Sequence, residues 1–118
     1  MVRINEMPFE DAVPIDGYGP GFFRVGGKLY QGAVICLSAE VLPWSGLADR
    51  AALLALAGKI DVLLLGTGAE MSHIDADLRT ALEELDIGVE TMASPTACRS
   101  YNVLASEGRR VAAALLPV

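Results

Sequence analysis

Cysteines, aromatic residues and basic residues are all scarce in this sequence. Its two cysteines, Cys36 and Cys98, have neither a CxxC spacing nor a histidine beside them, so they do not form a zinc motif. We interpret them as free thiols in a reducing compartment. Nine basic residues against fifteen acidic ones give a net charge of −6, which repels phosphate backbones. We therefore expect no nucleic-acid partner, no metal and no cofactor.

Targeting signals and long apolar runs are missing as well. The first residues contain no apolar core, and Glu6, Glu10 and Asp11 disfavour a transit peptide. The region from Ala51 to Leu65 is interrupted by glycine and charged residues, and it is shorter than the roughly 20 apolar residues that span a membrane. We therefore predict a cytoplasmic protein without membrane insertion. Its size and its 53% apolar content suit one domain, residues 1–118.

Turn-forming residues divide the amino-terminal third of the chain. Residues 1–14 are expected to be an irregular lead-in, with one brief strand around Ala12–Ile15. The next segment predicts two strands joined at Gly26–Gly27, a dipeptide that suits the positive φ angles of a hairpin turn. The second strand is expected to run from about Lys28 to Leu37, where β-branched and aromatic residues are frequent.

Apolar spacing predicts alternating helices and strands in the remainder. Helical spacing indicates helices over residues 48–56, 74–85 and 94–107. Short apolar runs indicate strands over residues 60–65, 87–92 and 111–116, the first of them covered on both faces and central in a parallel arrangement. This order predicts an α/β fold: a single three-layer domain in which an N-terminal hairpin and helices accompany a mixed β-sheet.

A glycine-containing turn, Gly66-Thr67-Gly68, follows the central strand. A dinucleotide loop has a third glycine, but Met71 stands at that position, and Glu70 places negative charge where a phosphate would lie. The turn is therefore predicted to be a tight corner between strand and helix. The carboxyl end of such a strand is still where ligand crevices form in open α/β sheets.

The third predicted helix contains the best candidate for a reactive group. Ser94 is expected to be its N-cap, with Pro95 at the first helical position. Cys98 then lies in the opening turn, where the helix dipole and Arg99 would lower the thiol pKa. The alternative, which we favour on frequency, is an inert thiol packed against the core. Helical spacing places Cys98 on one face with Asn102, and Tyr101 on an apolar face.

Two further residues each have a structural and a functional interpretation. His73, the only histidine, can act as a general base, but the sequence fixes no partner for it. Trp44 is either a cover over the core, which we favour from the size of its apolar surface, or an exposed anchor for a partner.

Three segments carry a resemblance to a known family. These are "YGPGFFRVGGKLYQGAVI", "DVLLLGTG" and "GVETMASPTACRSYNVLASEGRRVAAALL". Together with Trp44 they resemble the family of mitochondrial complex I assembly factor 3 and its bacterial and archaeal relatives, from about Ile15 to Leu116. The resemblance implies a compact three-layer α/β domain, no established enzyme activity and a role in assembling respiratory complex I.

Two function classes follow from these observations. The leading hypothesis is a non-catalytic protein-interaction or assembly module, with other proteins as partners, including complex I subunits or assembly proteins. A homo-oligomer is left open. The alternative is a small-ligand-binding protein or enzyme that uses a crevice at the corner and the third helix. Its candidate residues are Gly66, Thr67, Gly68, Cys98, Arg99, Tyr101 and Asn102.

Overall fold

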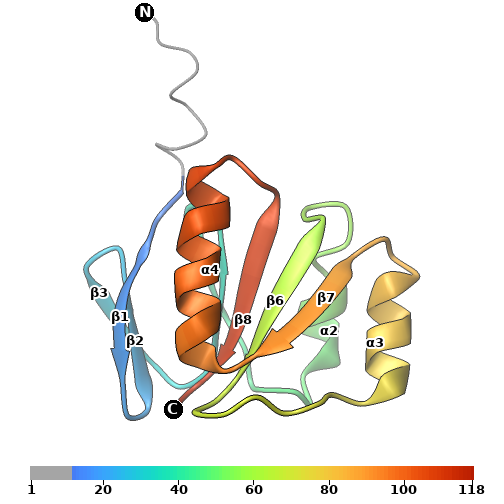
Figure 1. Cartoon of the computed structure of the whole chain (residues 1–118), viewed down its shortest axis with the longest axis horizontal. Helices are drawn as coiled ribbons and strands as arrows, with labels where there is room; N and C mark the ends of the chain where they lie inside the picture. Colours follow the sequence, from blue (N-terminus) through green and yellow to red (C-terminus); the bar gives the residue numbers. More distant parts are fainter. Residues whose placement is uncertain (1–11) are drawn as a thin grey trace, which may run out of the picture.

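A five-stranded mixed sheet forms the middle of the protein, in a computed structural model that describes residues 12–118 (Figure 1). The strand order is β5-β4-β8-β6-β7. The inner strand β6 pairs in parallel with both β7 and β8, whereas β4 is antiparallel to β5 and β8. The strands are β4 (Val34–Leu37), β5 (Glu40–Pro43), β6 (Val62–Thr67), β7 (Gly88–Met92) and β8 (Val111–Leu116). The predicted mixed sheet and its central parallel strand are confirmed.

Two outer layers cover the sheet. Helices α2 (Arg50–Leu54) and α3 (Ala76–Glu83) pack on one face. Helix α4 (Ser94–Ser106) and a small antiparallel sheet pack on the other. The small sheet contains β1 (Ile15–Gly19), β2 (Phe22–Val25) and β3 (Lys28–Gln31) in that order. The predicted three-layer α/β architecture is therefore confirmed.

Alternation along β6 and β8 creates two separate cores. Leu63 and Leu65 point into the layer with α2 and α3, while Leu64 points into the layer with α4. All three are at most 1% exposed, and each buried leucine contributes about 1.5–3 kcal/mol. The short side chains of Ala112 to Ala114 on β8 leave room for elements on both faces. This is why the apolar run of β6 has no polar alternation.

The amino-terminal third corrects two predictions. The brief strand expected around Ala12–Ile15 is wrong, because β1 starts at Ile15 and continues to Gly19. The single strand expected from Lys28 to Leu37 is also wrong, because Gly32 adopts a φ of 82° and turns the chain between β3 and β4, which belong to different sheets. Of the predicted lead-in over residues 1–14, the part up to residue 11 lies outside the described residues.

The predicted glycine turn and the predicted burial of Trp44 are both observed. Gly26 and Gly27 both have positive φ angles, 57° and 81°, in the turn that joins β2 to β3. The indole of Trp44 is 4% exposed and donates a hydrogen bond to the Asp49 carbonyl at 3.2 Å. The interpretation of Trp44 as a core cover is therefore confirmed. Over residues 12–118, no helix has the length and apolar character needed to cross a membrane.

Candidate functional site

The glycine corner at the end of β6 is packed directly against the start of α4. A Cβ atom added to Gly66 would lie 2.8 Å from the Ser94 Oγ, 2.9 Å from the Ser94 Cα and 3.0 Å from a methyl of Leu115. These distances are below normal contact, so glycine at position 66 allows the helix to approach the sheet. The corner and the start of α4, which are the two places named in the crevice hypothesis, are therefore in contact.

Ser94 closes this corner with three hydrogen bonds. Its hydroxyl accepts a bond from the Gly68 N–H at 2.9 Å and donates one to the Leu116 carbonyl at 2.6 Å. Its own N–H donates to the Gly68 carbonyl at 2.7 Å. Ser94 is completely buried, and the N-cap of α4 is Ala93. The prediction of Ser94 as an N-cap is wrong, because the hydroxyl joins β6, α4 and β8 instead of capping its own helix.

The Thr67 hydroxyl organises the loop that follows. It accepts a bond from the Ser72 N–H at 2.8 Å, and it lies within hydrogen-bonding distance of the carbonyls of Glu70, at 2.9 Å, and Met92, at 3.2 Å. The Gly68 N–H is already bonded to Ser94. An anion at this corner would have to displace these bonds before it could use the donors, which agrees with the interpretation of the turn as a tight corner.

The thiol of Cys98 is packed between α4 and the sheet. It is 5% exposed, and burial raises its pKa from 9.0 to about 11, although the neighbouring Arg99 acts in the opposite direction. Burial raises the pKa of Cys36 further, to about 12, with a smaller contribution from Cys98. The burial agrees with the favoured interpretation of Cys98 as a thiol packed against the core, because loss of solvation outweighs the lowering by Arg99.

Tyr101 belongs to the same buried layer. Its side chain is 0% exposed, and burial, followed by the nearby Cys36, raises its pKa to about 12. Within the described part of the chain, its hydroxyl has no hydrogen-bond partner of normal geometry, although the nearby Ser38 backbone acts to lower the pKa. An orphaned buried hydroxyl costs stability, so the apolar ring is what holds this position together.

Asn102 connects α4 to the small sheet through hydrogen bonds. Its Oδ1 accepts a bond from the Ile15 N–H, and its Nδ2 donates to the Ile15 carbonyl, both at 2.9 Å. This pair of bonds satisfies the side-chain amide and the first residue of β1 together. Asn102 also borders a cavity with Ala12, Val13 and Pro14. Its observed role is therefore to position β1.

Arg99 is exposed and borders a different cavity. This cavity is a groove of about 460 Å³ beside α4, which we call the α4–β7 groove. It is lined by Val62, Leu64, Glu90, Arg99, Ser100, Val103, Leu104 and Arg109. Since Arg99 and Asn102 line separate cavities, the seven predicted residues do not surround one crevice.

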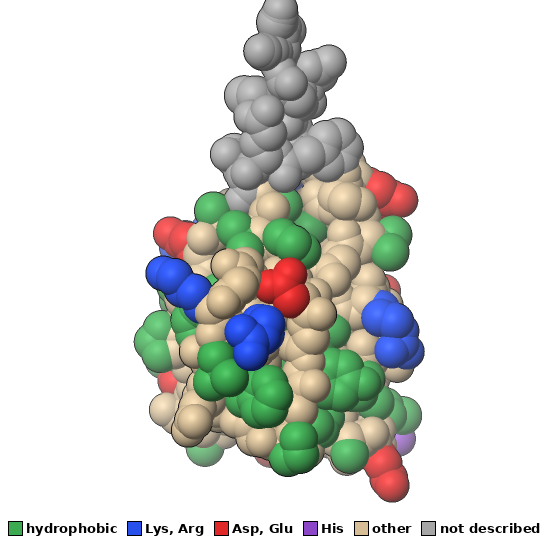
Figure 2. All heavy atoms as spheres, turned by 90° about the vertical axis from the view of Figure 1, so that its left-hand side faces the viewer, with side chains coloured by type: hydrophobic (Ala, Val, Ile, Leu, Met, Phe, Trp, Pro, Cys, Tyr) green, Lys and Arg blue, Asp and Glu red, His purple; other side chains and the backbone are tan. Residues whose placement is uncertain are grey.

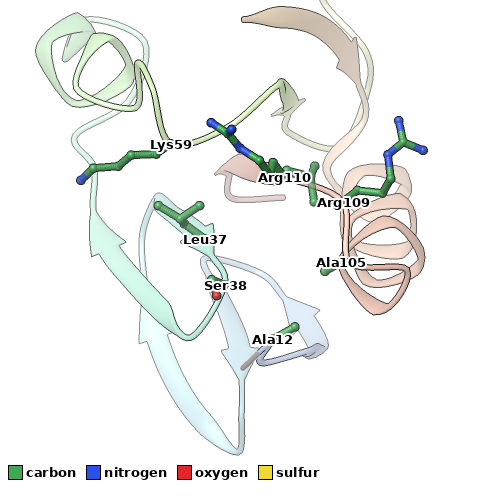
Figure 3. A pocket seen from close by; sticks show the side chains of 9 residues that line it. Ala12, Leu37, Ser38, Lys59, Ala105, Arg109 and Arg110 are labelled. Atoms are coloured by element: carbon green, nitrogen blue, oxygen red, sulfur yellow. The ribbon is translucent and has the colours of Figure 1, made fainter. Parts of the chain in front are cut away.

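A second hollow lies at the amino-terminal end of β8 (Figure 3). It has a volume of about 240 Å³, and Lys59, Arg109 and Arg110 are among its lining residues. Figure 3 shows Lys59 and Arg109 extending away from it in different directions. Arg110 bonds the Gly58 carbonyl at 2.8 Å and lies 3.9 Å from the Asp61 carboxylate. The three cations do not converge, so the hollow is not built for an anion.

The face of the small sheet carries side chains of mixed type. Figure 2 shows apolar, basic and acidic groups interspersed there, with no field of one sign. Leu29 and Tyr18 are 46% and 44% exposed. His73, elsewhere on the protein, is exposed, and no hydrogen bond of its side chain occurs among the residues described. Neither feature supplies a catalytic arrangement.

Sequence reasoning missed two features of the site. Ser94 precedes a proline at the start of a helix, which is the usual pattern of an N-cap, and only the packing of β8 shows where its hydroxyl points. The α4–β7 groove joins residues of β6, β7 and α4 that are far apart in sequence. The sequence signal that could have found the groove is Val103, a valine four residues after Arg99 and off the buried face of α4, and the structure shows it 55% exposed.

Relatives of known sequence match nearly the whole chain. An uncharacterized protein of Rhodobacter capsulatus is 50% identical over 114 residues, which span 97% of this chain and 92% of that protein. The Danio rerio protein named NADH dehydrogenase (ubiquinone) 1 alpha subcomplex assembly factor 3 is 33% identical over 123 aligned residues, which span 98% of this chain and 71% of that protein. The resemblance predicted from the three sequence segments is confirmed.

Solved structures show the same fold. The crystal structure of a protein from Bartonella henselae, described as an outer membrane protein, matches with a TM-score of 0.84 and 35% identity, and the match covers 93% of this chain and 98% of that one. The family described as "Protein of unknown function (DUF498/DUF598)" matches residues 15–116, and the chain belongs to this family.

Proposed function

We propose that the protein is a non-catalytic interaction module that helps to assemble a multisubunit membrane complex of the NADH dehydrogenase type. The observation that carries this proposal is the 33% identity with the Danio rerio assembly factor across 98% of the chain. A match of this extent includes both outer layers and the central sheet. The proposed partners are subunits or assembly proteins of that complex, and the proposed location is the cytoplasm.

The contacts made by the candidate site residues support a structural role for them. Ser94, Gly66 and Gly68 hold the start of α4 against the sheet, and Asn102 holds β1. Cys98 is buried, with a raised pKa. A ligand at the glycine corner would need the Gly68 N–H and the Thr67 hydroxyl, and both are engaged inside the protein. We therefore favour a function exerted through the outer surface.

Affinity capture from the native cell tests the proposal. The chain carries a tag, complexes are cross-linked before lysis, and co-purifying proteins are identified against a tag-only control. We expect enrichment of NADH dehydrogenase subunits or assembly proteins. We also expect that deleting the gene lowers the amount of intact complex on native gels. Normal complex levels in the deletion strain, together with no such enrichment, would contradict the proposed function.

A further inference from the structure

One strip of the central sheet is left open on the side of α4. Helix α4 packs on β6 and β8, and the small sheet lies beyond it toward β4. Figure 1 shows β7 at the edge of the sheet with no helix in front of it. On the opposite face, α3 packs against β7. No helix of the described residues therefore covers β7 on the side of α4.

The α4–β7 groove occupies this strip, and its apolar part comes from two sides. On the sheet side, half-buried Val62 is the accessible apolar residue and Leu64 is only 1% exposed, while Val103 and Leu104 belong to the helix wall. Val103 is 55% exposed although it borders a sheet surface that a further element would normally cover. An occupant that covered Val103 would remove this apolar surface from water, which is favourable.

Two arginines give the groove its charge. Arg99 lies on α4 and Arg109 follows its end, so both line the helix wall. Within residues 12–118, neither guanidinium lies within 4.0 Å of a carboxylate, whereas Arg50, Arg79 and Arg110 each do. In a chain of net charge −6, two cations without acidic partners beside one apolar groove favour an acidic occupant.

An arginine side chain at the outer edge of β7 disfavours the pairing of another strand there. The Arg79 guanidinium donates a hydrogen bond at 2.9 Å to the Val89 carbonyl on β7. A charged side chain at a sheet edge discourages pairing with another strand. The open face beside α4, rather than the edge, is therefore where an element is expected to add.

We propose that the α4–β7 groove binds an amphipathic acidic segment of a partner protein, whose apolar side chains cover Val103 and the β6 side while carboxylates pair with Arg99 and Arg109. This inference rests on the proposed interaction function and names its surface.

Glu90 distinguishes a protein segment from a lipid surface. It lies on the β7 side of the groove, opposite the two arginines, so the groove carries both signs of charge. A uniformly anionic surface would meet Glu90 as well as the arginines, with a like-charge penalty. A peptide can place carboxylates on one side only, so the arrangement favours a peptide.

Selection from a phage-displayed library of random 16-residue peptides tests the proposal on the intact chain. We expect enriched peptides that combine apolar residues at helical spacing with Asp or Glu. In fluorescence anisotropy, the double variant Arg99→Glu/Arg109→Glu should bind them about tenfold more weakly or worse, since two attractive charge pairs become repulsive. Val103→Asp should weaken binding as well. The matched control Arg24→Glu/Lys28→Glu makes the same charge change on the small sheet and should bind like the original chain.

Several outcomes would overturn the proposal. These are recovery of no binding peptides, enrichment of basic peptides, or equal binding by the groove variant and the control. Sedimentation with vesicles of phosphatidylcholine and phosphatidylglycerol tests the membrane alternative. Vesicle binding that requires Arg99 and Arg109 would assign the groove to a membrane. If the groove variant still captures complex subunits from cells, the groove inference fails while the proposed function stands. If the original chain captures none, the proposed function fails.

Discussion

Replacing Ser94 tests the corner that joins β6, α4 and β8. Ser94→Ala removes the hydroxyl that accepts from the Gly68 N–H and donates to the Leu116 carbonyl. Gly68 is buried, so water cannot readily replace the lost partner. An unsatisfied buried polar group costs about 1–3 kcal/mol. With two groups affected, we expect a loss of about 2–4 kcal/mol from the free energy of unfolding.

A second substitution separates this role from helix capping. An N-cap serine is replaced well by aspartate, and its change to alanine costs about 1 kcal/mol. At the buried position observed here, an aspartate cannot donate to the Leu116 carbonyl, which lies 2.6 Å from the serine oxygen, and its charge is removed from water. Ser94→Asp is therefore expected to be less stable than Ser94→Ala at pH 7.

Urea unfolding followed by circular dichroism measures both variants. With a slope of about 2 kcal/mol per molar, in the middle of the usual range, the midpoint of Ser94→Ala should fall by about 1–2 M. Ser106→Ala is the matched control, because its hydroxyl is exposed near the end of the same helix and its change should stay within about 0.5 kcal/mol. If Ser94→Asp is as stable as the original chain, or Ser94→Ala costs no more than the control, the assigned role of Ser94 is refuted.

Further predictions concern stability and thiol chemistry. Gly66→Ala should lower the free energy of unfolding by about 1–3 kcal/mol through overpacking, measured by urea unfolding. Asn102→Ala should lower it by about 2 kcal/mol, whereas Tyr101→Phe should leave it unchanged or raise it, because the removed hydroxyl has no partner within residues 12–118. Native Cys36 and Cys98 should react slowly with iodoacetamide at pH 8, and rapid labelling without denaturant would contradict their burial. Both thiol pKa values are raised on folding, to about 12 and about 11, so their contribution to stability is complete below pH 9 and should be lost as the pH rises toward 11–12.

The fold was largely predictable because its signals are local. An unbroken apolar run can be buried only on both faces, so β6 had to be an inner strand. Positive φ angles at Gly26 and Gly27 make a hairpin turn wherever that pair occurs between strands. The break between β3 and β4 was missed because Gly32 lies within a run of strand-forming residues. Which sheet each half joins depends on distant partners: β4 pairs with β8, nearly eighty positions later in the chain.

The candidate site was less predictable because its groups act through tertiary contacts. Helical position left Cys98 with two interpretations, an activated thiol and a packed one, and the packing of α4 on the sheet favours the second because it buries the thiol and raises its pKa. Arg99 was placed with the glycine corner, yet it lies on the groove beside β7. Spacing along one helix cannot show which neighbouring strand each face will meet.

The sequence by itself determined the element types, the mixed sheet and the family, because apolar periodicity, glycine turns and shared segments are properties of the chain read in order. Only the tertiary structure decided what Ser94 bonds, how deeply the thiols lie and where the sheet stays open. Those properties depend on the approach of segments far apart in sequence, such as Gly68, Ser94 and Leu116. Burial then sets the energy of each polar group that they enclose.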